Sequence, residues 1–229
     1  MRRQSPGDAY YSDVVALYHF DANVGGPCVD SGPLGLPGVF GNTTAYGNLQ
    51  SSVVKWGSNA LHVSDQSNFN IQGTSSPHWA VGSSDFTIEF WVYPTTFANQ
   101  TELYIGATNE LLAYDVTVYL TSAGKVGFLC KGTSGSTYAS LVSSGALTLN
   151  AWNFVQCRRV GSTFAIGIGG SQDTASTVGT AALYAIGTTA VCICGSNTHP
   201  QPTYMDDFRM TVGVGRAFAL PTAAFPSHG

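Results

Sequence analysis

The sequence DFTIEFWVYP occupies residues 85–94 and has the clearest strand pattern in the chain. Apolar side chains alternate with other residue types, so that one face of the segment carries Phe86, Ile88, Phe90 and Val92. A period of two indicates a β-strand with one buried face. Pro94 ends the segment, since proline has no N–H to donate inside a sheet. We therefore expect this strand near the centre of a β scaffold.

The length and charge of the chain restrict its class. It has 229 residues, which all-β sandwiches commonly fill as one domain. A domain of this size buries roughly 70% of the surface of its unfolded chain, so it needs no metal ion or disulfide to fold. Nine Lys and Arg against 13 Asp and Glu give a net charge of −4. Nucleic acids and anionic membranes select clustered basic residues, so neither is an expected partner.

Further segments with a strand pattern follow along the whole chain. They are residues 14–21, 60–63, 103–107, 113–120, 126–130, 147–160, 163–168, 191–194 and 205–211. Gly- and Ser-containing turns at residues 122–125 and 161–162 predict hairpins, and residues 69–81 are interpreted as a loop. We expect about twelve to fourteen antiparallel strands, arranged as a two-sheet sandwich or a closed barrel. Long Gly- and Pro-rich segments favour the sandwich.

Cysteine usage and the chain start bear on the compartment. The five cysteines include no CxxC pair, which argues against the common zinc motifs. Cys192 and Cys194 would lie about 6.8 Å apart on one strand face, near the limit for a disulfide, and we expect free thiols in a reducing cytoplasm. No secretory signal is recognised at the start, and no apolar run is long enough to span a membrane.

Residues 1–12 show no periodicity. We interpret them as an extended N-terminal arm that docks on a neighbouring subunit, followed by one domain at residues 13–229. A disordered terminus is the alternative.

Several segments resemble the concanavalin A-like lectin/glucanase superfamily, specifically its laminin-G-like jelly rolls. They are residues 15–21 (VALYHFD), 30–32 (DSG), 85–94 and 152–154 (WNF). The closing stretch is similar to a form found in virion proteins of tailed bacteriophages, at residues 204–217 (YMDDFRMTVGVGRA) and 221–226 (PTAAFP). The resemblance covers about residues 13–226. It implies a jelly-roll sandwich of two antiparallel sheets and a role in binding or display.

The resemblance therefore implies a non-enzymatic structural or decoration protein of a bacteriophage virion, on head or tail, made in the bacterial host cytoplasm. Release by lysis would explain a lectin fold without an export signal. Its expected partners are capsid or tail proteins, copies of itself and glycans. A free-standing carbohydrate-binding module is the alternative, and a glycoside hydrolase is a third class.

Catalytic patterns are missing from the sequence. Glucanases of the superfamily carry carboxylates in an ExDxE pattern, whereas Thr87 stands between Asp85 and Glu89 here. Those two carboxylates would be about 13 Å apart on an extended strand, too far for retaining or inverting hydrolysis. Asp206 and Asp207 are adjacent and are expected to point to opposite faces. We predict that the protein is not an enzyme.

Relatives often hold a structural calcium ion between an aspartate of the last strand and an acid near the first. By this resemblance Asp206 and Asp21 are the candidate calcium ligands, and oxygen ligands suit that ion. The alternative is that both carboxylates cap turns or pair with arginines such as Arg209 or Arg216.

Aromatic residues are the candidate glycan-binding groups. Trp91 and Tyr93 lie opposite the apolar face of the central strand, and Trp79 and Tyr46 fall in expected loops. Sugar rings stack on exposed aromatic faces. The alternative for Trp91 is that it packs beneath a loop.

Overall fold

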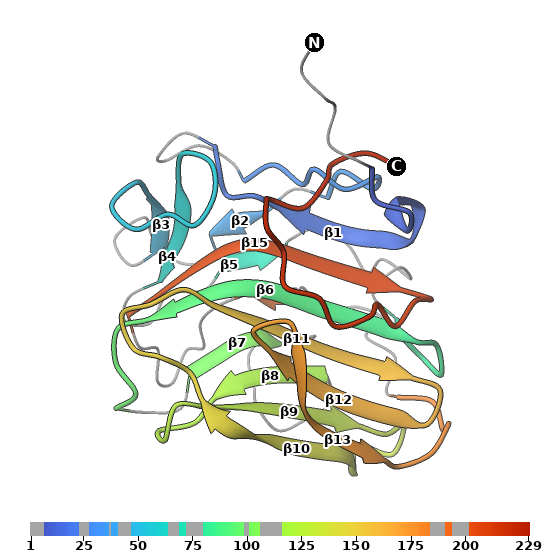
Figure 1. The fold of residues 1–229 in the computed structure, drawn as a ribbon. Coiled ribbons are helices and arrows are strands. Elements are labelled where there is room, and N and C mark those ends of the chain that lie inside the picture. The colour runs from blue at the N-terminus through green and yellow to red at the C-terminus, as the bar shows by residue number, and fades with distance from the viewer. Residues whose placement is uncertain are drawn as a thin grey trace.

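The structure is a computed structural model that describes residues 7–22, 28–36, 38–40, 47–63, 69–71, 80–98, 101–105, 116–183, 191–193 and 202–229. These residues form two antiparallel sheets packed face to face, with one 3-10 turn at Tyr11–Asp13 (Figure 1). The predicted all-β jelly-roll sandwich is confirmed. The described part of the chain contains no helix long and apolar enough to cross a membrane.

The two sheets contain eight and seven strands. The eight-stranded sheet has the order β13 (Ser171–Thr177), β12 (Thr163–Ile168), β11 (Asn153–Val160), β6 (Phe86–Pro94), β15 (Thr203–Val212), β4 (Ala60–Val63) and β3 (Gly47–Gln50), and β1 (Val14–Tyr18) also pairs with β15. The seven-stranded sheet has the order β10 (Thr137–Ala146), β9 (Lys125–Lys131), β8 (Val116–Leu120), β7 (Thr101–Ile105), β14 (Val191–Ile193), β5 (Phe69–Ile71) and β2 (Val39–Phe40).

The predicted central strand is β6, which lies between β11 and β15. The sequence pattern did not predict five of the strands, which are β2, β3, β5, β10 and β13. The interpretation of residues 69–81 as a loop was wrong for β5, and residues 147–152 precede β11 rather than belonging to it. β13 has the sequence SQDTAST, whose polar side chains show no buried face, and its pairing with β12 defines it as a strand.

The core lies between the sheets. The side chains of Phe86, Ile88, Phe90 and Val92 all point into it and have no exposed surface. Each such side chain contributes roughly 1.5–3 kcal/mol through burial. Cys28, Cys130 and Cys157 are free and buried, which confirms the expected thiols at these positions. The pairing of Cys192 and Cys194 lies outside the described side chains.

Both chain ends pack on the outer face of the eight-stranded sheet. The segment after β15 crosses in front of β15 and β6, and the N-terminal residues lie beside it (Figure 1). The Asp8 N–H donates to the His228 carbonyl at 2.8 Å. Residues 7–12 therefore pack on the domain, and the division into an arm at residues 1–12 and a domain at residues 13–229 stays a prediction. Residues 1–6 lie outside the described part of the chain.

A buried charge network fastens these segments to the sheet. We call Asp8, Glu89, Arg209 and Arg216 the outer-face charge network. Arg209 donates to Glu89 at 2.8 Å and to Asp8 at 2.8 Å, and Arg216 donates both of its terminal nitrogens to Asp8 at 2.9 and 2.8 Å. All four residues are at most 9% exposed. Two cations and two anions thus join the N-terminal segment, the central strand, the last strand and the C-terminal segment.

The two carboxyl groups of the network differ in their environments. Burial raises the pKa of Asp8, but the hydrogen bond and charge of Arg216, with Arg209, outweigh it and hold that pKa below its usual value. At Glu89 burial dominates over the same arginines, and the pKa is raised. The two arginines therefore favour the ionised form of both carboxyl groups, and at Glu89 burial opposes them more strongly.

Replacing Arg209 by alanine should cost about 3–5 kcal/mol in unfolding free energy, because it leaves two buried carboxyl groups short of a partner. Arg158→Ala is the matched control, since Arg158 donates to a backbone carbonyl and pairs with no carboxylate among the described residues; it should cost about 1 kcal/mol. Urea denaturation of both variants measures the difference. Equal losses would contradict a structural role for the charges.

Candidate functional site

Four part-exposed rings lie side by side across the outer face of the eight-stranded sheet. Cross-strand register places Tyr204 of β15 between His62 of β4 and Tyr93 of β6. Trp152 immediately precedes β11, whose Asn153 pairs with Val92, so its ring reaches Tyr93. We call His62, Tyr204, Tyr93 and Trp152 the aromatic row.

Each ring of the aromatic row contacts the next ring along the row. Ring centroids are 4.3 Å apart for His62 and Tyr204, 5.9 Å for Tyr204 and Tyr93, and 5.6 Å for Tyr93 and Trp152. The ring planes of Tyr204 and Tyr93 are at 89°, so the edge of one ring meets the face of the other. Burial lowers the pKa of His62, which keeps that ring neutral near pH 7. The row is an uncharged surface on which a chain of sugar rings can both stack and form hydrogen bonds.

Trp91 is placed differently from Tyr93. It is 5% exposed and packs against Phe154 and, edge to face, against Trp56 of the loop before β4. The Lys55 ammonium lies 3.9 Å from its ring centroid. The structure thus shows the alternative, Trp91 beneath a loop, while Tyr93 stays part-exposed. Trp79 and Tyr46 lie outside the described residues.

β15 contains a β-bulge at Asp206 and Asp207, where its pairing with β6 changes register. Asp207 has a φ of 51°, and the flanking Met205 and Phe208 both point into the core. Two consecutive carboxylates therefore face outward. The prediction that Asp206 and Asp207 point to opposite faces is wrong, because it assumed an unbroken period of two.

Asp207 links three segments. Its Oδ1 pairs with His19 Nδ1 at 2.5 Å, just after β1, and its Oδ2 accepts the Phe225 N–H at 2.6 Å. Burial lowers the pKa of His19, but the hydrogen bond and charge of Asp207 outweigh it, so the pKa of His19 is raised. The hydrogen bond from the Phe225 N–H to Asp207 holds the C-terminal segment against the sheet.

Asp206 is buried beneath the loop of residues 51–59. Its Oδ2 accepts the N–H groups of Lys55 at 2.9 Å and Trp56 at 3.0 Å. Burial is the main cause that raises the pKa of Asp206, to about 7. Its Oδ1 is buried and has no hydrogen-bond partner within the described structure.

Asp21, the second candidate calcium ligand, is exposed and holds the other end of the same loop. Its Oδ1 accepts the N–H groups of Ser58 at 2.6 Å and Asn59 at 3.2 Å. Gly57, with a φ of +66°, packs directly on this carboxylate, where a Cβ would collide. Both aspartates thus cap one loop, which was the alternative to calcium binding. The described residues contain no cluster of three or more metal-binding side chains.

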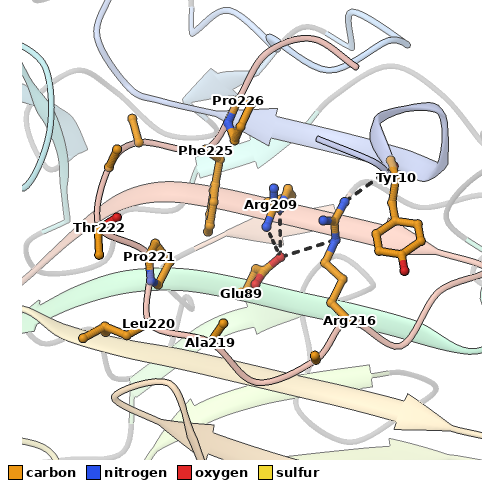
Figure 2. Close-up of a pocket in the computed structure, with 13 residues that line it drawn as sticks. Tyr10, Glu89, Arg209, Arg216, Ala219, Leu220, Pro221, Thr222, Phe225 and Pro226 are labelled. Atoms are coloured by element: carbon orange, nitrogen blue, oxygen red, sulfur yellow. Dashed lines mark hydrogen bonds and ion pairs between the residues drawn. The ribbon is translucent and has the colours of Figure 1, made fainter. Parts of the chain in front are cut away.

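A hollow of about 380 Å³ lies above the outer-face charge network (Figure 2). Ala217, residues 219–226 and Tyr10 form its rim, and Glu89, Arg209 and Arg216 lie beneath. The charge contacts of Glu89 are made by Oε1, and Arg209 also stacks on Phe225 at 3.8 Å. Asp85 does not line this hollow and instead accepts the Gly161 N–H at 2.6 Å. The two carboxylates of the glucanase comparison therefore do not both line this hollow.

A family model described as the concanavalin A-like lectin/glucanases superfamily (Laminin_G_3) matches residues 63–211, more than half of the chain. The protein belongs to this superfamily. A comparison with curated protein sequences finds no match.

Solved structures similar to this superfamily member include binding domains of clostridial toxins. The receptor-binding domain of botulinum neurotoxin C/D mosaic serotype has a TM-score of 0.66 and 12% identity, over 90% of this chain and 49% of that one. The binding domain of Paraclostridial Mosquitocidal Protein 1 has a TM-score of 0.65 and 14% identity, over 91% and 50%. The binding domain of botulinum neurotoxin DC in complex with SialylT has a TM-score of 0.64 and 10% identity, over 89% and 48%. The chain spans about half the length of these structures, and the likeness shows the fold.

Three members of the aromatic row in this lectin-like domain were missed by sequence reasoning. His62 and Tyr204 alternate with buried residues of β4 and β15, so each carried the signal of an outward position. Trp152 belongs to a segment recognised only for its resemblance. No local pattern shows that strands far apart in sequence place these rings together with Tyr93, because that depends on sheet order.

Proposed function

We propose that the protein is a non-enzymatic lectin-like domain that binds glycans through the aromatic row. The observation that carries this proposal is the contiguous line of four part-exposed rings on β4, β15, β6 and the residue just before β11. Aromatic faces bind the apolar faces of sugars, and the uncharged hydroxyl and imidazole groups add hydrogen bonds. Solved structures of similar fold are binding domains, one of them in complex with SialylT, which supports the proposal.

The absence of catalysis is part of the proposal. Glu89 is 3% exposed and held by arginine, and Asp85 caps a turn, so neither is placed as a paired acid and base.

A glycan array probed with the purified protein tests the binding function. Tyr93→Ala and Trp152→Ala should each weaken the strongest interactions about five- to tenfold, because each removes a stacking surface. Tyr119→Ala is the matched control, since Tyr119 lies on the outer face of the opposite sheet and should leave binding unchanged. Wild-type protein that binds no glycan, or variants that bind as wild type does, would contradict the proposal.

We further propose that the domain is displayed on a bacteriophage virion, on head or tail, with capsid or tail proteins and copies of itself as partners. The support is the resemblance of residues 204–226 to phage virion proteins. In the structure this stretch forms β15 and the segment that covers the outer face. A free-standing carbohydrate-binding module is the competing function.

Electron microscopy and analytical ultracentrifugation of the purified protein separate these two. A virion component should form rings or larger particles, and antibody against it should label phage particles at one fixed place. A protein that stays monomeric at all concentrations and never labels particles would favour the free-standing module.

We also propose that Asp206 and Asp21 bind a structural calcium ion. The buried, unpartnered Asp206 Oδ1 supports the proposal, since calcium takes carboxylate oxygens at flexible geometry. Asp21 lies close by, because both carboxylates accept backbone N–H groups of the loop of residues 51–59.

Chelation should lower the melting temperature of the wild type but not that of Asp206→Ala. Because the pKa of Asp206 is about 7 and only the ionised carboxylate binds the metal, the calcium-dependent stabilisation should grow as the pH rises through 7. Differential scanning fluorimetry at pH 6 and pH 8, with calcium or chelator, measures this. An unchanged wild-type melt in chelator at pH 8 would remove the calcium proposal.

A further inference from the structure

Lys55 presents an unpaired cation beside the aromatic row. Its ammonium lies 3.9 Å from the Trp91 ring centroid and 4.9 Å from that of Trp56. Within the described parts of the chain, no carboxylate or carbonyl oxygen contacts this ammonium. The side chain is only part-buried, so its outward side can be reached by a ligand.

The other cations on this face already have partners. Arg209 and Arg216 pair with the carboxylates of the outer-face charge network, and Arg158 donates to the Arg216 carbonyl at 2.6 Å. Asp206 accepts the backbone N–H of Lys55 and not its ammonium. Lys55 is therefore the cation of the described outer face that remains available to an external anion.

The position of the ammonium relative to the row suits an acidic sugar. Trp91 and Tyr93 point to the same face of β6 and lie two residues apart, which is roughly 7 Å along an extended strand. This is about the width of one sugar ring. A carboxylate on a sugar that stacks on Tyr93 and Trp152 can therefore reach the ammonium above Trp91. The two indole rings shield that ammonium from water on one side, which strengthens its attraction to an anion.

We propose that the glycan bound by the aromatic row is acidic, with the carboxylate of one sugar paired to Lys55 and the adjoining ring stacked on Tyr93 and Trp152. This inference rests on the proposed glycan binding and adds the chemical class of the ligand. The lysine ammonium is a point charge with three hydrogen-bond donors and can bind a carboxylate or a sulfate, so the test includes both kinds of anion.

The experiment uses an array that carries neutral glycans, carboxylate-bearing glycans with sialic or uronic acids, and sulfated glycans. The carboxylate-bearing set should contain the strongest interactions. Lys55→Gln should weaken these at least tenfold at low salt, and Lys55→Arg should keep most of the affinity because it retains the charge. Methyl esterification of the best ligand should reproduce the loss in the wild type. Raising the ionic strength should weaken binding by the wild type more than by Lys55→Gln.

Lys125→Gln is the matched control, because Lys125 lies on β9 of the opposite sheet. Melting temperatures establish that each variant is folded. Binding confined to neutral glycans, to sulfated glycans, or to acidic glycans that Lys55→Gln binds as well as the wild type does, would overturn the acidic-ligand inference and leave the proposed function standing. Wild-type protein that binds no glycan at all would overturn both.

Discussion

The outer-face charge network is the interaction on which the rest of the outer face depends. Two arginines and two carboxylates are removed from water there, and each ion would be costly to bury alone. Mutual pairing offsets that cost only when all four are in place. Because Asp8 and Glu89 lie far in sequence from each other and from the two arginines at and just after the end of the chain's last strand, the pairing fixes how both chain ends cross the sheet.

The network and the β-bulge divide the outer face into two regions. At one end the charges are mutually neutralised and covered by the C-terminal segment, under a small hollow. At the other end, beyond Asp206 and Asp207, the bulge directs two carboxylates at the loop and segment that they hold. The aromatic row lies past this point, where none of the described residues forms a charged network over the strands.

The sequence predicted the two-sheet sandwich better than it predicted which residues lie together on the outer face. Alternation identified β6 and most of the strands around it, because burial of one face imposes a period of two. It missed β13, which has no buried face, and it misplaced Asp207, because a bulge breaks the period without a local signature. The aromatic row could be predicted only in part: Tyr93 was identified, but its neighbours depend on strand order. Trp91 points to the same face of β6 as Tyr93, but the loop that carries Trp56 covers it.

The contact between the two chain ends has a topological consequence. Asp8 and His228 are joined by a backbone hydrogen bond, so the chain enters and leaves the domain at one point. A domain of this kind can be carried within a loop of another protein, or its ends can be joined and reopened elsewhere, without stretching either connection. Both ends of the described chain therefore lie against the same sheet that carries the aromatic row.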